Sequence, residues 1–143
     1  MLRNIPAIIS PALLACLAEM GHGDEIVICD ANFPACSTSN NYLRLDGALA
    51  TEALEAVLKL MPLDSYVKNP AITMEVVGND TMVPDIVRIF QKIINKTADT
   101  PAGIVTLERF AFYERTKQAY AVIQTTELRL YGNIILKKGV ITP

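Results

Sequence analysis

The sequence contains a single histidine, His22, which lies between two glycines in a stretch, residues 19–25, that also carries three carboxylates. Histidine is the side chain that can both donate and accept a proton near neutral pH. A glycine on each side lets the backbone bring the ring close to a bound molecule. A lone histidine in a loop is more often simply solvated. His22 is therefore a candidate acid–base catalyst whose assignment depends on the residues that accompany it.

Further polar side chains occur where predicted strands end or turn. They are Asp30, Arg109, Tyr131 and Asn133. A carboxylate and a guanidinium can hold neighbouring hydroxyl groups as acceptor and forked donor, and a phenol and an amide add directional hydrogen bonds. Aromatic faces such as those of Phe33 and Tyr113 can cover the C–H surface of a sugar. These residue types predict a site for an uncharged polyhydroxyl ligand.

Several catalytic and cofactor motifs are absent from the sequence. There is no G-x-S-x-G nucleophile turn and no P-loop, and Gly21-His22-Gly23 is too short for a Rossmann glycine pattern. A zinc site would need His22 together with Cys16, Cys29 and Cys36. Their spacings match no zinc finger or ribbon. We therefore expect acid–base chemistry, with no metal and no cofactor.

Charge and hydropathy exclude other partners. The 143 residues carry a net charge of −2, so no basic field attracts nucleic acid or an anionic membrane. No uncharged run approaches the roughly 18 residues that span a bilayer. Apolar residues make up 51% of the chain and charged residues only 20%. The excess apolar surface predicts subunit contacts.

The cysteines and the first residues bear on the cellular compartment. Three cysteines, an odd number, fall in a predicted helix, a strand and a loop, which favours free thiols in a reducing compartment. Residues 1–6 have one basic side chain, and the apolar stretch after them is broken by Pro6 and Pro11, a poor secretory signal. We expect a cytoplasmic protein.

Hydrophobic periodicity predicts alternating strands and helices that position these side chains. We expect helices at 11–20, 52–61, 84–95 and 110–118, with Ser10 and Thr51 as the N-caps of the first two. We expect strands at 26–29, 43–45, 71–77, 104–107, 119–125 and 134–137, and a loop at 31–41. His22 then lies between a helix and a strand. This order predicts one α/β domain, residues 1–143, with a mixed sheet and helices on both faces.

Four blocks of sequence resemble the ribose pyranase and fucose mutarotase family across nearly the whole chain. They are Met20-Gly21-His22-Gly23-Asp24-Glu25, Asp30 before Phe33-Pro34, Glu108-Arg109-Phe110-Ala111-Phe112-Tyr113-Glu114-Arg115, and Tyr131-Gly132-Asn133-Ile134 with Lys137-Lys138-Gly139-Val140. Arginine at position 109 looks like the fucose branch, because ribose pyranases tend to have histidine there. Position 120, which is tyrosine here, varies with phenylalanine in the family, so the resemblance does not decide whether the protein also has a secondary pyranase activity.

The resemblance implies a fold, an assembly and roles for the site residues. It implies a three-layer α/β/α domain in rings, commonly decamers of two pentameric rings, with sites near the subunit contacts. It makes His22 the proton donor and assigns sugar binding to Asp30, Arg109, Tyr131, Gly132 and Asn133. The expected function is a mutarotase that interconverts the anomers of L-fucose or a related reducing sugar. The alternatives are a non-catalytic sugar-binding accessory of a transport system, a ribose pyranase and a scaffold ring.

Overall fold

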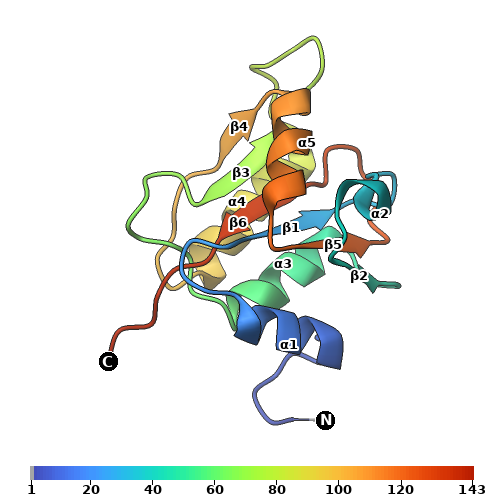
Figure 1. Ribbon diagram of the computed structural model, residues 1–143. Helices are drawn as coiled ribbons and strands as arrows, with labels where there is room; N and C mark the ends of the chain where they lie inside the picture. The colour runs from blue at the N-terminus through green and yellow to red at the C-terminus, as the bar shows by residue number, and fades with distance from the viewer. Residues whose placement is uncertain (1) are drawn as a thin grey trace.

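The computed structural model describes residues 2–143, which form five helices and six strands (Figure 1). The helices are α1 (Pro11–Glu19), α2 (Ala35–Thr38), α3 (Ala50–Leu58), α4 (Asp85–Thr97) and α5 (Arg109–Gln118). The strands are β1 (Glu25–Cys29), β2 (Tyr42–Leu45), β3 (Ala71–Met74), β4 (Val105–Leu107), β5 (Ala121–Thr125) and β6 (Ile134–Lys137). In this part of the chain no helix is long and apolar enough to cross a membrane.

The strands form one sheet in the order β2-β5-β1-β6-β3-β4. β6 runs antiparallel to both of its neighbours, whereas the other pairs are parallel. The prediction of a mixed α/β sheet is confirmed. We call the edge where β1, β3, β4 and β5 end and β6 begins the carboxyl edge, and the opposite edge the amino edge.

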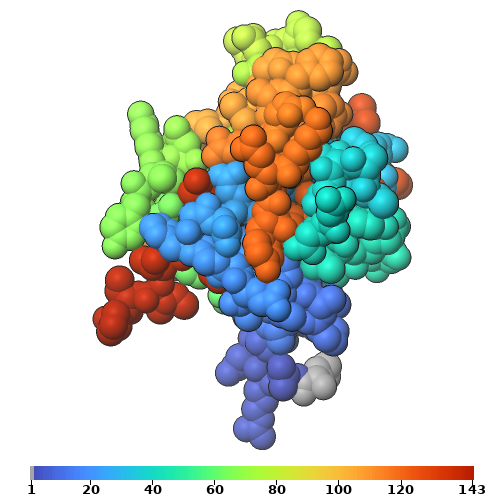
Figure 2. Space-filling model, viewed as in Figure 1, coloured from blue at the N-terminus to red at the C-terminus, as the bar shows by residue number. Residues whose placement is uncertain are grey.

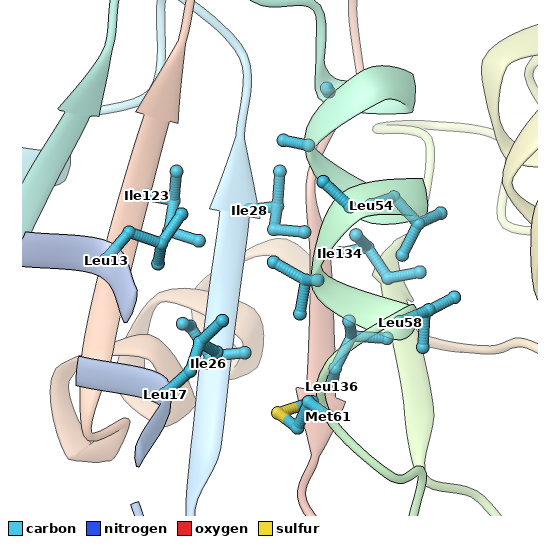
Figure 3. Packing of buried hydrophobic residues seen from close by; sticks show 14 of the residues in the cluster. Leu13, Leu17, Ile26, Ile28, Leu54, Leu58, Met61, Ile123, Ile134 and Leu136 are labelled. Atoms are coloured by element: carbon cyan, nitrogen blue, oxygen red, sulfur yellow. The ribbon is translucent and has the colours of Figure 1, made fainter. Parts of the chain in front are cut away.

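Both faces of the central strand β1 are buried, as its continuous apolar run predicts. Ile26 and Ile28 pack in the larger hydrophobic cluster with side chains of α1, α3 and α4. Figure 3 shows Leu13 and Leu17 of α1 and Leu54 of α3 meeting this face. The alternate residues Val27 and Cys29 pack in a second cluster with Phe112 of α5. Helices therefore cover both faces of the sheet and hold β1 rigidly between them.

The helix starts follow local capping. Ser10 accepts a hydrogen bond from the Leu13 N–H at 3.2 Å, so the predicted N-cap of α1 is confirmed. The N-cap predicted at Thr51 is wrong. α3 already begins at Ala50, two residues earlier, because the Glu52 carboxylate accepts the Leu49 N–H at 2.7 Å.

Two segments differ from the predicted pattern. The loop predicted at 31–41 contains the short helix α2, and β3 ends at Met74, before the predicted strand does. Gly78, with φ of +78°, turns the chain beyond β3. Figure 2 shows the yellow-green segment after β3 projecting at the top and the light green loop after α3, with the red C-terminal segment, projecting at the left. Exposed apolar side chains lie in these segments, at Tyr66, Val67, Val77, Met82, Val83, Val140 and Ile141.

Candidate functional site

His22 lies in the turn that joins α1 to β1 at the amino edge. Its Nε2 is 3.3 Å from Oδ1 of Asp64, a carboxylate whose side chain is only 2% exposed, whereas the histidine side chain is 47% exposed. The glycine after it, Gly23, has a φ of +86°, a conformation that other residues rarely adopt. One side of the imidazole therefore contacts a buried carboxylate while the other remains open to a ligand.

Asp64 is itself held on both sides. Its N–H donates to the carbonyl of Lys137 at 3.0 Å, and its Oδ1 accepts the N–H of Tyr66 at 3.0 Å. The Tyr66 ring, which is largely exposed, lies 5.5 Å from the His22 ring between centroids. We call His22, Asp64 and Tyr66 the histidine cluster. The sequence does not indicate that Asp64 belongs to the site, because no pattern in the connection before β3 distinguishes a buried carboxylate from a solvated one.

Asp30 ends β1 at the carboxyl edge and is paired with Asn133, which precedes β6. The Asp30 N–H donates to Asn133 Oδ1 at 2.9 Å, and Asn133 Nδ2 donates to Asp30 Oδ2 at 3.1 Å. Asp30 Oδ1 also accepts the Asn32 N–H at 2.9 Å. Burial raises the pKa of Asp30, against the opposing effect of these hydrogen bonds. These hydrogen bonds fix the two buried polar side chains relative to each other.

Tyr131 and Gly132 shape the turn into β6. Tyr131 has a φ of +62°, and its hydroxyl accepts the Val77 N–H at 3.1 Å. A Cβ at Gly132 would lie 2.9 Å from Glu127 Cγ and 3.1 Å from the Arg129 carbonyl. Only glycine fits there without displacing a neighbour. This packing holds Tyr131 beside the segment after β3.

Arg109 begins α5 directly after β4, at the same carboxyl edge. Its guanidinium carbon lies 4.7 Å from the centroid of the Phe110 ring, and the residue lines a hollow of about 370 Å³ with Glu75, Asp80 and others. β4 is two strands from β6, roughly 10 Å at about 4.8 Å per strand. We call Asp30, Arg109, Tyr131 and Asn133 the carboxyl-edge cluster.

The two clusters lie at opposite edges of the sheet. β1 runs from the amino to the carboxyl edge, and the five steps from Glu25 to Asp30 span roughly 16 Å at about 3.3 Å per residue. The pairing of Glu25 with Lys137 and of Ile28 with Ile134 places the Asp64 contact and the Asn133 contact at opposite ends of β6. Within one chain the structure brings the four carboxyl-edge residues to one edge and keeps His22 away from them.

The fold is a mixed α/β sheet with a histidine–carboxylate pair at one edge and the carboxyl-edge cluster at the other. Hydrogen-bonding groups of these types are typical of a protein that binds a small polar ligand. The model of the RbsD / FucU transport protein family matches residues 3–141. The chain belongs to that family.

Named relatives are similar over almost their full length. The fucose mutarotase of Homo sapiens is 47% identical over 146 residues, which cover 98% of this chain and 94% of the relative. That of Bos taurus is 46% identical, with 99% and 95% covered. The crystal structure of the fucose mutarotase in complex with L-fucose from Streptococcus pneumoniae superposes with a TM-score of 0.92 at 48% identity, covering 99% of this chain and all of that one.

Proposed function

We propose that this protein is a sugar mutarotase that interconverts the α and β anomers of L-fucose or a closely related reducing sugar. The contact between half-exposed His22 and buried Asp64 is the observation that carries the proposal, because a binding protein needs no such proton-transfer pair. The relatives called fucose mutarotase and the structure solved with L-fucose support this sugar as the substrate.

The reaction needs two proton transfers and no covalent intermediate. One proton is delivered to the ring oxygen and one is removed from the anomeric hydroxyl, after which the open chain rotates about C1–C2 and closes on the other face. His22 delivers or takes up a proton through its open side. Asp64 orients the imidazole, and it is the second group through which a proton can pass. Such acid–base help contributes about 10²–10⁴-fold.

The carboxyl-edge cluster supplies the groups that would bind the sugar. The carboxylate of Asp30 accepts hydrogen bonds from hydroxyl groups, and the forked guanidinium of Arg109 donates to two sugar oxygens at once. Tyr131 and Asn133 add a phenol and an amide, while Gly132 permits the close turn that holds them. The proposed reaction uses no cofactor, because ring opening and closure need only proton transfers.

A site that uses both clusters requires two copies of the chain, because the clusters lie at opposite edges of one sheet. Each edge also exposes apolar side chains. Val77 and Phe110 border the hollow beside Arg109, and Tyr66, Val140 and Ile141 border a hollow of about 420 Å³ beside the histidine cluster. Contact between two different faces of identical chains is heterologous, and it makes a ring when the rotation from one copy to the next closes. We propose that such rings, stacked as a decamer of two pentamers by family resemblance, complete the site.

Saturation-transfer NMR tests the activity directly. Magnetisation saturated on one anomer of L-fucose should appear on the other at a rate proportional to the protein concentration, and more slowly on ribose. Binding without accelerated exchange would instead identify a sugar-binding accessory. Faster exchange on ribose than on L-fucose would identify a pyranase-type preference.

The cysteines support a reducing compartment, and we propose the cytoplasm. Cys16 and Cys29 are buried, and Cys36 is exposed, and all three are free thiols. Burial raises the pKa of Cys16 and of Cys29, which keeps both as inert neutral thiols. Unpaired thiols persist where the environment is reducing.

A further inference from the structure

Lys138 follows β6 at the amino edge, and its partly buried side chain runs to the end of α1. The ammonium Nζ donates to the carbonyl of Leu17 at 2.8 Å and to that of Met20 at 2.5 Å. The last carbonyl groups of a helix have no partner within the helix, and the C-terminal end of its dipole favours a cation. Lys138 therefore holds the chain directly before the His22 turn.

The backbone of the same residue holds the chain directly after His22. The carbonyl of Lys138 accepts the Gly23 N–H at 2.9 Å, and its N–H donates to the Asp24 carbonyl at 2.8 Å. His22 thus lies between two points that are both tied to one residue. Within the turn, the Asp24 carboxylate accepts the Gly21 N–H at 2.7 Å, which shortens the free span further.

Asp64 is tied to the neighbouring position of the same segment, through the carbonyl of Lys137. Two successive backbone carbonyls therefore hold Asp64 and Gly23, the residue after His22, and these backbone bonds remain whatever side chain is present at position 138. The ammonium of Lys138 links this segment to the end of α1. Without it, the Met20 side of the turn could move while the Gly23 side stayed in place.

We propose that Lys138 is a positioning residue that fixes His22 against Asp64 by joining the end of α1 to the end of β6. The inference rests on the proposed mutarotase function for its kinetic consequence, but its structural consequence is independent of any activity. Loss of the ammonium should loosen residues 20–24 and move the imidazole relative to Asp64. A misplacement of about 1 Å can cost up to about 100-fold in rate.

Lys138→Met is the variant to test, because methionine keeps an unbranched apolar side chain and removes the three N–H donors. We expect kcat for L-fucose anomer exchange to fall roughly tenfold with little change in KM, since the carboxyl-edge cluster is untouched. Lys138→Arg keeps the cation and should recover most of the rate. Lys117→Met is the matched control, because Lys117 pairs only with exposed Glu114 on α5.

A second measurement does not depend on activity. Amide hydrogen exchange at Gly21 and at the His22 and Asp24 positions should accelerate in Lys138→Met and not in Lys117→Met, and the ¹⁵N shifts of the His22 ring should change only in the former. If Lys138→Met does not fold, Lys138→Gln, which keeps an amide donor, should show the same changes to a smaller extent.

The outcomes separate the two proposals. Unchanged amide exchange and unchanged His22 ring shifts in a folded Lys138→Met or Lys138→Gln would overturn the positioning role, whatever the kinetics. Failure of arginine to restore the rate and the exchange pattern would do the same. Absence of anomer exchange in the wild-type protein would overturn the mutarotase function alone, while the amide and ring measurements would still decide the role of Lys138.

Discussion

At the scale of single residues, the proposed role of His22 depends on its contact with Asp64. The carboxylate is buried and already accepts the Tyr66 N–H, so it cannot turn away to water. The imidazole is half-exposed and keeps one side for the substrate. A buried acceptor beside an accessible ring is an arrangement that orients the ring without help from a third residue.

His22→Gln tests this chemistry. Glutamine preserves hydrogen bonding toward Asp64 but cannot gain or lose a proton, so we expect anomer exchange to fall by about 10²–10⁴-fold, to the level of the sugar alone. Saturation-transfer NMR gives the rate, and circular dichroism and light scattering serve as controls for fold and assembly. Full exchange in His22→Gln would contradict the mechanism.

The sequence predicts His22 and the four carboxyl-edge residues as candidates because their types and their places beside glycines and strand ends are visible in it. It does not predict Asp64, whose burial depends on the backbone bond to Lys137, far along the chain. It also does not predict which candidates share an edge. That depends on β6 running antiparallel between β1 and β3, a pairing that hydrophobic periodicity leaves open.

At the scale of elements, the helices and strands are mostly predictable because apolar spacing and capping residues are local. The differences occur at the ends of elements: β3 is shorter than its apolar pattern, and α3 starts early because Glu52 accepts the N–H of the nearby Leu49. Contacts between distant parts of the chain are not visible in local spacing. In the segment after β6, Gly139 passes so close to residues 62–64 that a Cβ would lie 2.7 Å from the Leu63 carbonyl oxygen and 2.9 Å from the Asp64 Cα.

Gly139→Ala should therefore disturb the histidine cluster from a distance. The atoms it would meet belong to the backbone and cannot rotate away, so we expect a loss of about 1–3 kcal/mol in the free energy of unfolding and slower anomer exchange as Asp64 is displaced. Urea unfolding at fixed protein concentration measures the first effect. Gly103→Ala is the control, because nothing lies within 4 Å of a Cβ there. Equal stability of the two variants would contradict the close-approach argument.

The start of β1 carries an ion-pair network. Glu25 accepts hydrogen bonds from Arg115 at 2.6 and 3.0 Å, and Lys137 lies 3.4 Å away. Burial acts to raise the pKa of Glu25, but the hydrogen bond and charge of Arg115, with Lys137, outweigh it and hold the pKa below the ordinary value of 4.5. The unfolded chain thus binds the proton more readily, so this network stabilises the fold above pH 4.5 and is lost as pH falls through the lower folded pKa.

Glu25→Gln should weaken the dependence of the free energy of unfolding on pH in the acid range. We expect the free energy of unfolding of the variant to depend less on pH than that of the wild type below 4.5, because one carboxylate with a lowered pKa has been removed. Denaturant titrations at a series of pH values measure it. Glu114→Gln is the matched control, since Glu114 pairs with Lys117 on an exposed helix surface and should change the profile little. If the free energy of unfolding of Glu25→Gln depends on pH as strongly as that of the wild type, the ion pairs of Glu25 do not contribute to the pH dependence of stability.

At the scale of the whole molecule, the separation of the two clusters would give the proposed ring a chemical role. Apolar residues at both edges would be covered when one chain's carboxyl edge meets the next chain's histidine cluster. Composition alone predicts only that the chain is not a monomer, because an apolar excess does not say which faces meet. Light scattering should therefore give a mass many times 15.7 kDa.

Complementation between two impaired variants tests whether the site is shared. His22→Gln damages one edge and Arg109→Ala the other, and each alone should lose most anomer exchange, the second by about 10- to 100-fold through loss of a charge-assisted hydrogen bond. When the two are co-expressed and assemble at random in rings, about one quarter of the contacts join an intact histidine cluster to an intact carboxyl edge. Such mixed rings should recover about a quarter of wild-type exchange, whereas a mixture of separately assembled rings should recover none. Native mass spectrometry verifies that both chains share a ring, and mixed rings with no recovered activity would show that each chain carries its own complete site.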